Sequence, residues 1–152
     1  MRSTEPSPEL LPRAAPAHPY RRLLLFAVRR MAAGGIADAH AAHAILTGFG
    51  LGYRRPLILL RALMAEVSRV SAVQLKVAPC CCARMTRDEA MLLDLIAEAP
   101  SRPDQVHAAL RDLLHVHSCL GAVSSAAAVA NAFADLGMPL SDCNNRNRDG
   151  PF

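Results

Sequence analysis

The chain has 152 residues, a net charge of +4, and 52% hydrophobic but only 4% aromatic residues, which predicts one domain of closely packed helices. The first nineteen residues carry five prolines and no apolar stretch like that of a secretory signal, and the longest uncharged stretch is too polar for a membrane span. We therefore expect a cytoplasmic protein without a transmembrane segment, in which five cysteines are more typical of thiols or metal ligands than of disulfides.

Helical periodicity runs through most of the chain and is punctuated by glycine and proline. A Pro-rich stretch at 1–19 and a polar one at 141–152 are expected to be disordered tails around a helical domain at 20–140. That domain is predicted to be an all-α, single-domain bundle of about six helices. They are expected at Tyr20–Ala33, at Ile36–Thr47, from Pro56 onward, at Arg87–Ala99, at Asp104–His115 and at Ser124–Leu136.

Residues 72–78 alternate apolar and polar side chains over part of their length. This pattern is compatible with one short strand leading into the cysteines that follow. The sequence offers such a strand no obvious partner, and a lone strand is not stable.

The most distinctive stretch is Cys80–Cys82, where three of the five cysteines stand side by side. A helix start follows at once: Thr86 and Glu89 have the spacing of a capping box, in which each side chain accepts a hydrogen bond from a backbone N–H. The positive end of that helix and the flanking Arg84 and Arg87 would favour a thiolate over a thiol. Metal binding or thiol chemistry is therefore expected at this stretch.

A zinc site is the first hypothesis for the cysteines. If Pro79 holds the run extended, Cys80 and Cys82 point the same way and could supply half of a tetrahedral Zn²⁺ site. No paired CxxC spacing is present. The competing interpretation is that the cysteines are small buried residues near a helix start, as free cysteines commonly are.

Histidines would have to complete such a zinc site. His40 and His43 lie at i and i+3, so they share one face of the second expected helix and are the preferred ligands. His117 and Cys119 are the second choice. An HxxH pair alone is typical of one partly buried and one exposed histidine, so the pair gains meaning only beside the cysteines.

Thiol chemistry is the second hypothesis. Cys80 or Cys82 could act as a low-pKa nucleophile in a redox enzyme or a redox sensor. The sequence shows no Ser-His-Asp arrangement, nucleophile elbow or carboxylate dyad, which weighs against a hydrolytic enzyme.

The uneven distribution of charge suggests a third hypothesis, a site for nucleic acid or another polyanion. Residues 1–87 contain thirteen Lys or Arg against four Asp or Glu, whereas residues 88–152 contain four against nine. We favour pairing of the two halves within the fold, across a homodimer or with a protein partner over nucleic-acid binding. The arginines concerned are Arg21, Arg22, Arg29, Arg30, Arg54, Arg55 and Arg61.

Several short stretches resemble a family of small alphaproteobacterial proteins known only as a domain of unknown function. The resemblance spans roughly residues 20–140 and implies a bacterial cytoplasmic protein, but no activity, cofactor or catalytic residue. The stretches are Arg29-Arg30-Met31, Asp38-Ala39-His40-Ala41-Ala42-His43, Tyr53-Arg54-Arg55-Pro56-Leu57, Leu60-Arg61-Ala62, Ala78-Pro79-Cys80-Cys81-Cys82 with Arg84-Met85-Thr86, and Phe133-Ala134-Asp135-Leu136-Gly137.

Overall fold

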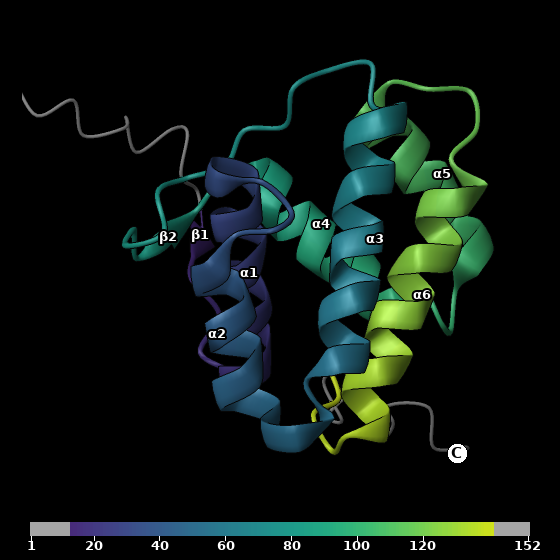
Figure 1. Ribbon diagram of the computed structural model, residues 1–152. Helices are drawn as coiled ribbons and strands as arrows, with labels where there is room; N and C mark the ends of the chain where they lie inside the picture. Colours follow the sequence, from purple (N-terminus) through teal and green to yellow (C-terminus); the bar gives the residue numbers. More distant parts are fainter. Residues whose placement is uncertain (1–12, 142–152) are drawn as a thin grey trace, which may run out of the picture.

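Six α-helices account for most of the computed structural model, which describes residues 13–141 (Figure 1). The prediction of an all-α bundle is confirmed, and the expected helices are all present with ends shifted by a few residues. Their bounds are α1 Pro19–Gly34, α2 Ala39–Phe49, α3 Arg54–Val70, α4 Arg87–Glu98, α5 Pro103–Leu114 and α6 Leu120–Asp135, with a 3₁₀ turn at Gly50–Gly52.

Local signals explain where the helices begin and end. Pro19 occupies the first turn of α1, where its missing N–H is not needed. The same helix stops at Gly35, whose φ of 91° is strained for residues with a side chain. At the end of α6, Gly137 has a φ of 78°, and the N–H of Met138 donates to the carbonyl of Phe133, as in a Schellman motif.

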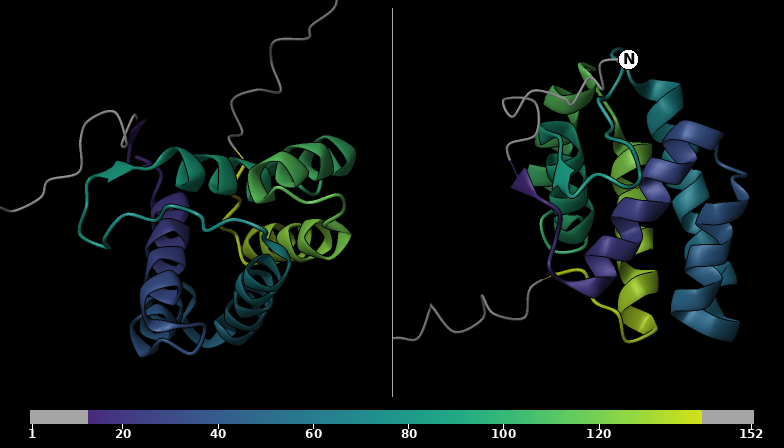
Figure 2. Two further views of the ribbon diagram at one scale, coloured as in Figure 1. Left: turned by 90° about the horizontal axis from the view of Figure 1, so that it is seen from above. Right: turned by 90° about the vertical axis from the view of Figure 1, so that its left-hand side faces the viewer.

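The helices form two groups (Figure 2). α1 and α2 make an antiparallel pair on one side, while α3 packs chiefly against α6 on the other, with α5 beyond. α4 lies behind and contacts both α1 and α6. The core between them consists mainly of Leu, Ala, Val and Met side chains, with Phe133 the largest that is fully buried. Among the described residues, the buried polar or charged ones are Arg29, Thr86 and Glu89.

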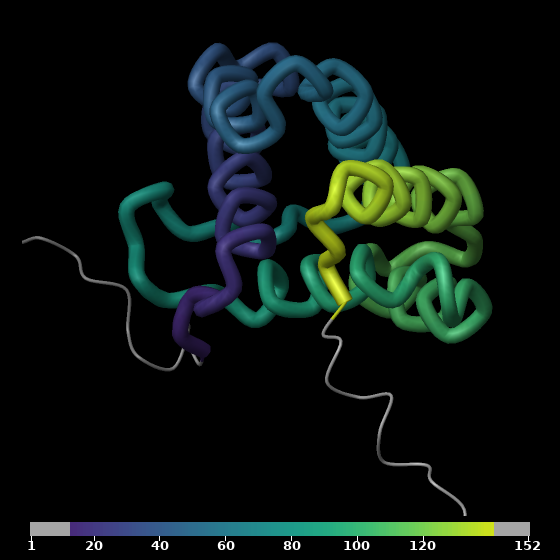
Figure 3. Tube along the Cα trace, turned by 90° about the horizontal axis from the view of Figure 1, so that it is seen from below, coloured from purple at the N-terminus to yellow at the C-terminus, as the bar shows by residue number. Residues whose placement is uncertain are grey.

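The link between α3 and α4, residues 71–86, projects beyond the helices on the α1 side (Figure 3). The short strand expected at 72–78 is absent. Two N–H groups of this stretch bind acidic side chains at the start of α4: Lys76 donates to Asp88 at 2.8 Å and Ala78 donates to Glu89 at 2.9 Å.

A strand does occur after the cysteines. β2, Arg84–Met85, pairs antiparallel with β1, Arg13–Ala14, with Arg13 opposite Met85 and Ala14 opposite Arg84. The stretch expected to be an N-terminal tail therefore includes β1 and, at Pro19, the first residue of α1. The remainder of both predicted tails, 1–12 and 142–152, lies outside the described residues.

Candidate functional site

The cysteine run forms a tight turn rather than the extended segment that the sequence suggested. The N–H of Cys82 donates to the carbonyl of Pro79 at 3.0 Å, which places Cys80 and Cys81 at the two central positions. Neither has a positive φ, so the turn is of type I geometry. Proline is accepted by turns and extended segments alike, and the hydrogen bond decides between them here.

The turn exposes its thiols. Cys80 and Cys81 are exposed and Cys82 is partly buried. The interpretation of the cysteines as small buried residues is therefore wrong for Cys80 and Cys81. It does describe Cys119, which is 3% exposed. Two neighbouring exposed cysteines at the surface need an explanation other than packing.

A buried ion pair holds the base of this turn. Arg29 of α1 donates through Nε to Glu89 Oε1 at 2.8 Å and through Nη2 to Glu89 Oε2 at 3.0 Å. The remaining guanidinium N–H groups reach the loop backbone, with Nη1 2.8 Å from the Cys82 carbonyl and Nη2 2.7 Å from that of Arg84. One arginine thus fixes the cysteine-bearing loop to both α1 and α4.

Glu89 is equally well satisfied. Its Oε1 accepts from Ala78 N and its Oε2 accepts from Thr86 N, each at 2.9 Å. The second contact completes the predicted capping box, in which Thr86 Oγ1 accepts from Glu89 N. The Thr86 hydroxyl also donates to the Lys76 carbonyl at 2.7 Å. Within residues 13–141, no buried side-chain nitrogen or oxygen lacks a hydrogen-bond partner, as a charged group in a protein interior requires.

A second ion pair lies beside the first cysteine. Arg30 donates through Nη2 to Asp38 Oδ2 at 2.8 Å, and the pKa of Arg30 is raised above its ordinary value, chiefly by this hydrogen bond and in smaller part by Cys80. The Asp38 carboxylate caps α2 by accepting from Ala41 N at 2.9 Å. The pKa of Asp38 is lowered by the Arg30 hydrogen bond, then by that of Ala41. Arg30 and Cys80 also line one groove.

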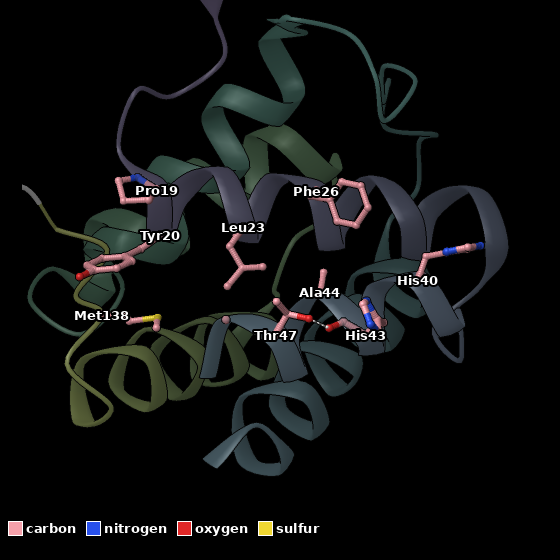
Figure 4. Close-up of a pocket in the computed structure, with 10 residues that line it drawn as sticks. Pro19, Tyr20, Leu23, Phe26, His40, His43, Ala44, Thr47 and Met138 are labelled. Carbon is pink, nitrogen blue, oxygen red and sulfur yellow. Dashed lines mark hydrogen bonds between the residues drawn. The ribbon is translucent and has the colours of Figure 1, made fainter. Parts of the chain in front are cut away.

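The two predicted histidine ligands line a different groove, of about 550 Å³, between α1 and α2. His40 and His43 lie at one end of it, and Tyr20 and Met138 at the other (Figure 4). The cysteines of the turn line other grooves, which contain no histidine. Across residues 13–141, no three His, Cys, Asp or Glu side chains are placed to hold one metal ion.

The second-choice ligands are also apart from the turn. α5 ends at Leu114, so His117 does not continue that helix. Cys119 is tied to His107: its N–H donates to Nε2 at 3.3 Å, and its Sγ donates to the carbonyl at 3.8 Å. These contacts make the Cys119 region a packed connection between α5 and α6.

Several arginines from the basic half pair with acids further along the chain. Arg21 contacts Asp94 of α4 at 2.9 Å and Arg55 contacts Asp135 of α6 at 2.7 Å, in addition to the Arg29–Glu89 pair. These contacts join helices of the two oppositely charged halves within one fold.

Comparison with known proteins gives a family but no activity. A model of a family of unknown function, DUF6628, matches residues 6–138. The chain belongs to this family. The span shared with DUF6628 contains all six helices, the cysteine turn and both members of the buried ion pair. No curated protein and no solved structure matches the chain. Within the described residues, no helix is both long and apolar enough to cross a membrane.

Proposed function

We propose that this protein is a thiol-based sensing module, and not an enzyme, whose reporter is the turn at Pro79–Cys82. The observation that carries the proposal is the exposure of Cys80 and Cys81 on a turn whose base is held by a buried ion pair. Exposed thiols are open to disulfides and peroxides.

The energetics of the anchor support this proposal. A buried ion pair gives little net stability compared with apolar residues of similar volume, because both charges must be desolvated. Both side chains also bind the backbone of the loop. Arg29 donates to the carbonyls of Cys82 and Arg84, and Glu89 accepts from the N–H of Ala78. The arrangement therefore fixes the position of the loop more than it stabilises the core.

The hydrogen bond from Arg29 to the Cys82 carbonyl would also convert a change at the thiols into a change in the loop. A bulky group on a thiol of the turn must be accommodated within a residue or two of the Cys82 carbonyl, which accepts from Arg29. Shifting that carbonyl would leave a buried donor without a partner, at a cost of about 1–3 kcal/mol. The chemical state of the thiols is thereby coupled to the ordering of residues 76–86.

Zinc binding is the weaker alternative. It would use Cys80 and Cys82 with His40 and His43, but the side chains at the two places line separate grooves. The Arg30 guanidinium beside Cys80 would also repel a divalent cation.

Native-state thiol modification tests the proposal. Reduced protein is treated with bis(2-hydroxyethyl) disulfide, modified cysteines are mapped by mass spectrometry, and amide hydrogen exchange is followed at Ala78 and Thr86. We expect reversible modification at Cys80 or Cys81, faster exchange at both amides, and reversal by dithiothreitol. Protection of the turn under native conditions would contradict the proposal.

Two further measurements separate the alternatives. The triple variant Cys80→Ser, Cys81→Ser, Cys82→Ser should keep the wild-type free energy of unfolding within about 0.5 kcal/mol, because two of the side chains are exposed, Cys82 is only partly buried, and the three contribute little packing. Protein purified without a histidine tag under reducing conditions is analysed for metal. One equivalent of zinc, with thiols that react only after a chelator is added, would replace the sensing function by the metal-binding one.

A further inference from the structure

A groove of about 520 Å³ lies between the cysteine turn and α1. Residues 15–17 form one wall and residues 80–83 the other, with Leu25, Phe26 and Arg29 of α1 between them. The walls are held together by the β1–β2 pair and by the N–H of Ala15, which donates to the Ala83 carbonyl at 2.8 Å. A volume of this size suits a small molecule of several hundred daltons.

Among the described residues that line the groove, one cation is free to meet a ligand. Arg29 lines the groove, but its guanidinium already donates hydrogen bonds to Glu89 and to the loop carbonyls. Arg22 also lines it, is exposed, and makes no ion pair or side-chain hydrogen bond with any described residue. No aspartate or glutamate is among the lining residues that the structure describes. The described part of the groove therefore presents thiols, an aromatic ring at Phe26 and the positive charge of Arg22.

Cys80 occupies a particular position. It lines this groove and also the neighbouring one that contains Arg30 and Lys76. Negative charge on its sulfur would lie near the Arg30 guanidinium. Cationic surroundings of this kind attract anionic reaction partners.

Resting on the function proposed above, we infer that the oxidant sensed by this turn is a low-molecular-weight disulfide bearing carboxylates, held in this groove by Arg22. The guanidinium of an arginine can bind both oxygens of a carboxylate through two parallel N–H groups. A neutral disulfide has no carboxylate and would gain nothing from Arg22. Cys80 is the thiol that reacts.

The reaction is a thiol–disulfide exchange. Cys80 loses its proton to solvent, and its thiolate attacks one sulfur of the bound disulfide. A bond forms between the Cys80 sulfur and that sulfur, the original disulfide bond breaks, and the other half leaves as a thiolate that takes up a proton. The Cys80 thiol is oxidised to a mixed disulfide, and the small disulfide is reduced by the same two electrons.

The test compares two probe disulfides, oxidised glutathione as the anionic one and bis(2-hydroxyethyl) disulfide as the neutral one. Rates of modification at Cys80 are measured by mass spectrometry in wild type, in Arg22→Gln and in Arg111→Gln. Arg111 is exposed on α5, away from the turn, and its substitution removes the same charge. We expect Arg22→Gln to slow the reaction with oxidised glutathione roughly fivefold while the neutral probe keeps its rate, and Arg111→Gln to change neither.

The outcomes distinguish this inference from the function beneath it. Equal slowing with both probes, or an unchanged rate with oxidised glutathione in Arg22→Gln, overturns the role of Arg22 and leaves the thiol sensor standing. Modification at Cys81 in place of Cys80 overturns the choice of nucleophile. If neither probe modifies the turn, the proposed function itself fails, and the inference fails with it.

Discussion

Arg29 and Glu89 face each other as a two-pronged pair, with Nε 2.8 Å from Oε1 and Nη2 3.0 Å from Oε2. Their side chains are only 2% and 1% exposed. The pair joins α1 to the start of α4 across 60 residues of sequence. Both partners also bind the intervening loop, so the pair closes the fold at the point where the cysteines are displayed.

Breaking this pair from one side should destabilise the protein strongly. Arg29→Met leaves the Glu89 carboxylate buried beside two N–H donors but without its counter-charge, and we expect a loss of about 3–5 kcal/mol in the free energy of unfolding. Arg29→Lys should recover only part of it, because an ammonium cannot span both carboxylate oxygens. Urea denaturation followed by circular dichroism gives these values.

An exposed pair provides the matched control. Arg55 and Asp135 also join two helices, at 2.7 Å, but their side chains are 59% and 58% exposed. Arg55→Met should therefore change the free energy of unfolding by no more than about 1 kcal/mol. Similar losses of the free energy of unfolding in Arg29→Met and Arg55→Met would show that the buried pair does not anchor the loop to α1 and α4.

The Asp38–Arg30 pair should give a measurable dependence of stability on acid pH. Because the folded protein lowers the pKa of Asp38 below its ordinary 3.8, the ionised carboxylate stabilises the fold. That contribution is fully present above pH 3.8 and is lost as the pH falls through the lower folded value. Asp38→Asn retains a cap for α2 but loses the charge. The stability difference between wild type and Asp38→Asn, from urea titrations between about pH 7 and 2.5, should shrink only in that acid range. A difference independent of pH would contradict this assignment.

We expect no appreciable binding of nucleic acid. Arg21, Arg29, Arg30 and Arg55, four of the seven arginines of the candidate polyanion site, are engaged by carboxylates of the same chain. Fluorescence anisotropy with labelled single- and double-stranded DNA and RNA at low salt should show no saturable change. Binding that weakens steeply with added salt would mean that phosphates displace these internal pairs.

Local features of the fold were predictable, and long-range ones were not. The capping box at Thr86 and Glu89 and the helix ends at Gly35 and Gly137 follow from residues a few positions apart, and all are present. Glu89 also lies three and four residues before the buried Leu92 and Leu93. Residues with this spacing share one face of a helix, so the sequence indicates that the Glu89 side chain is buried.

The partner of Glu89 could not be found in the same way. From the sequence, Arg29 lies near the end of the helix expected at Tyr20–Ala33 and next to Arg30, where interaction with the helix dipole explains it equally well. Its burial depends on how the loop crosses α1, which is a tertiary property. The turn at Pro79–Cys82 depends on the same crossing, and this is why an extended cysteine run was the wrong expectation.

Cys119 should behave as the opposite of the cysteines in the turn. Burial raises the pKa of its thiol above the ordinary 9.0, with Arg111 opposing the effect in smaller part. The folded protein therefore favours the neutral thiol of Cys119. The contribution of this thiol to the free energy of unfolding is present below pH 9.0 and is lost as the pH rises through the raised pKa of the folded state. Iodoacetamide at pH 8 should label Cys80 and Cys81 in the native protein and Cys119 only in denaturant. In parallel, the stability difference between wild type and Cys119→Ala should fall above about pH 9. Peptide mapping resolves each site, and native labelling of Cys119 as fast as that of Cys81 would show that the α5–α6 connection opens readily.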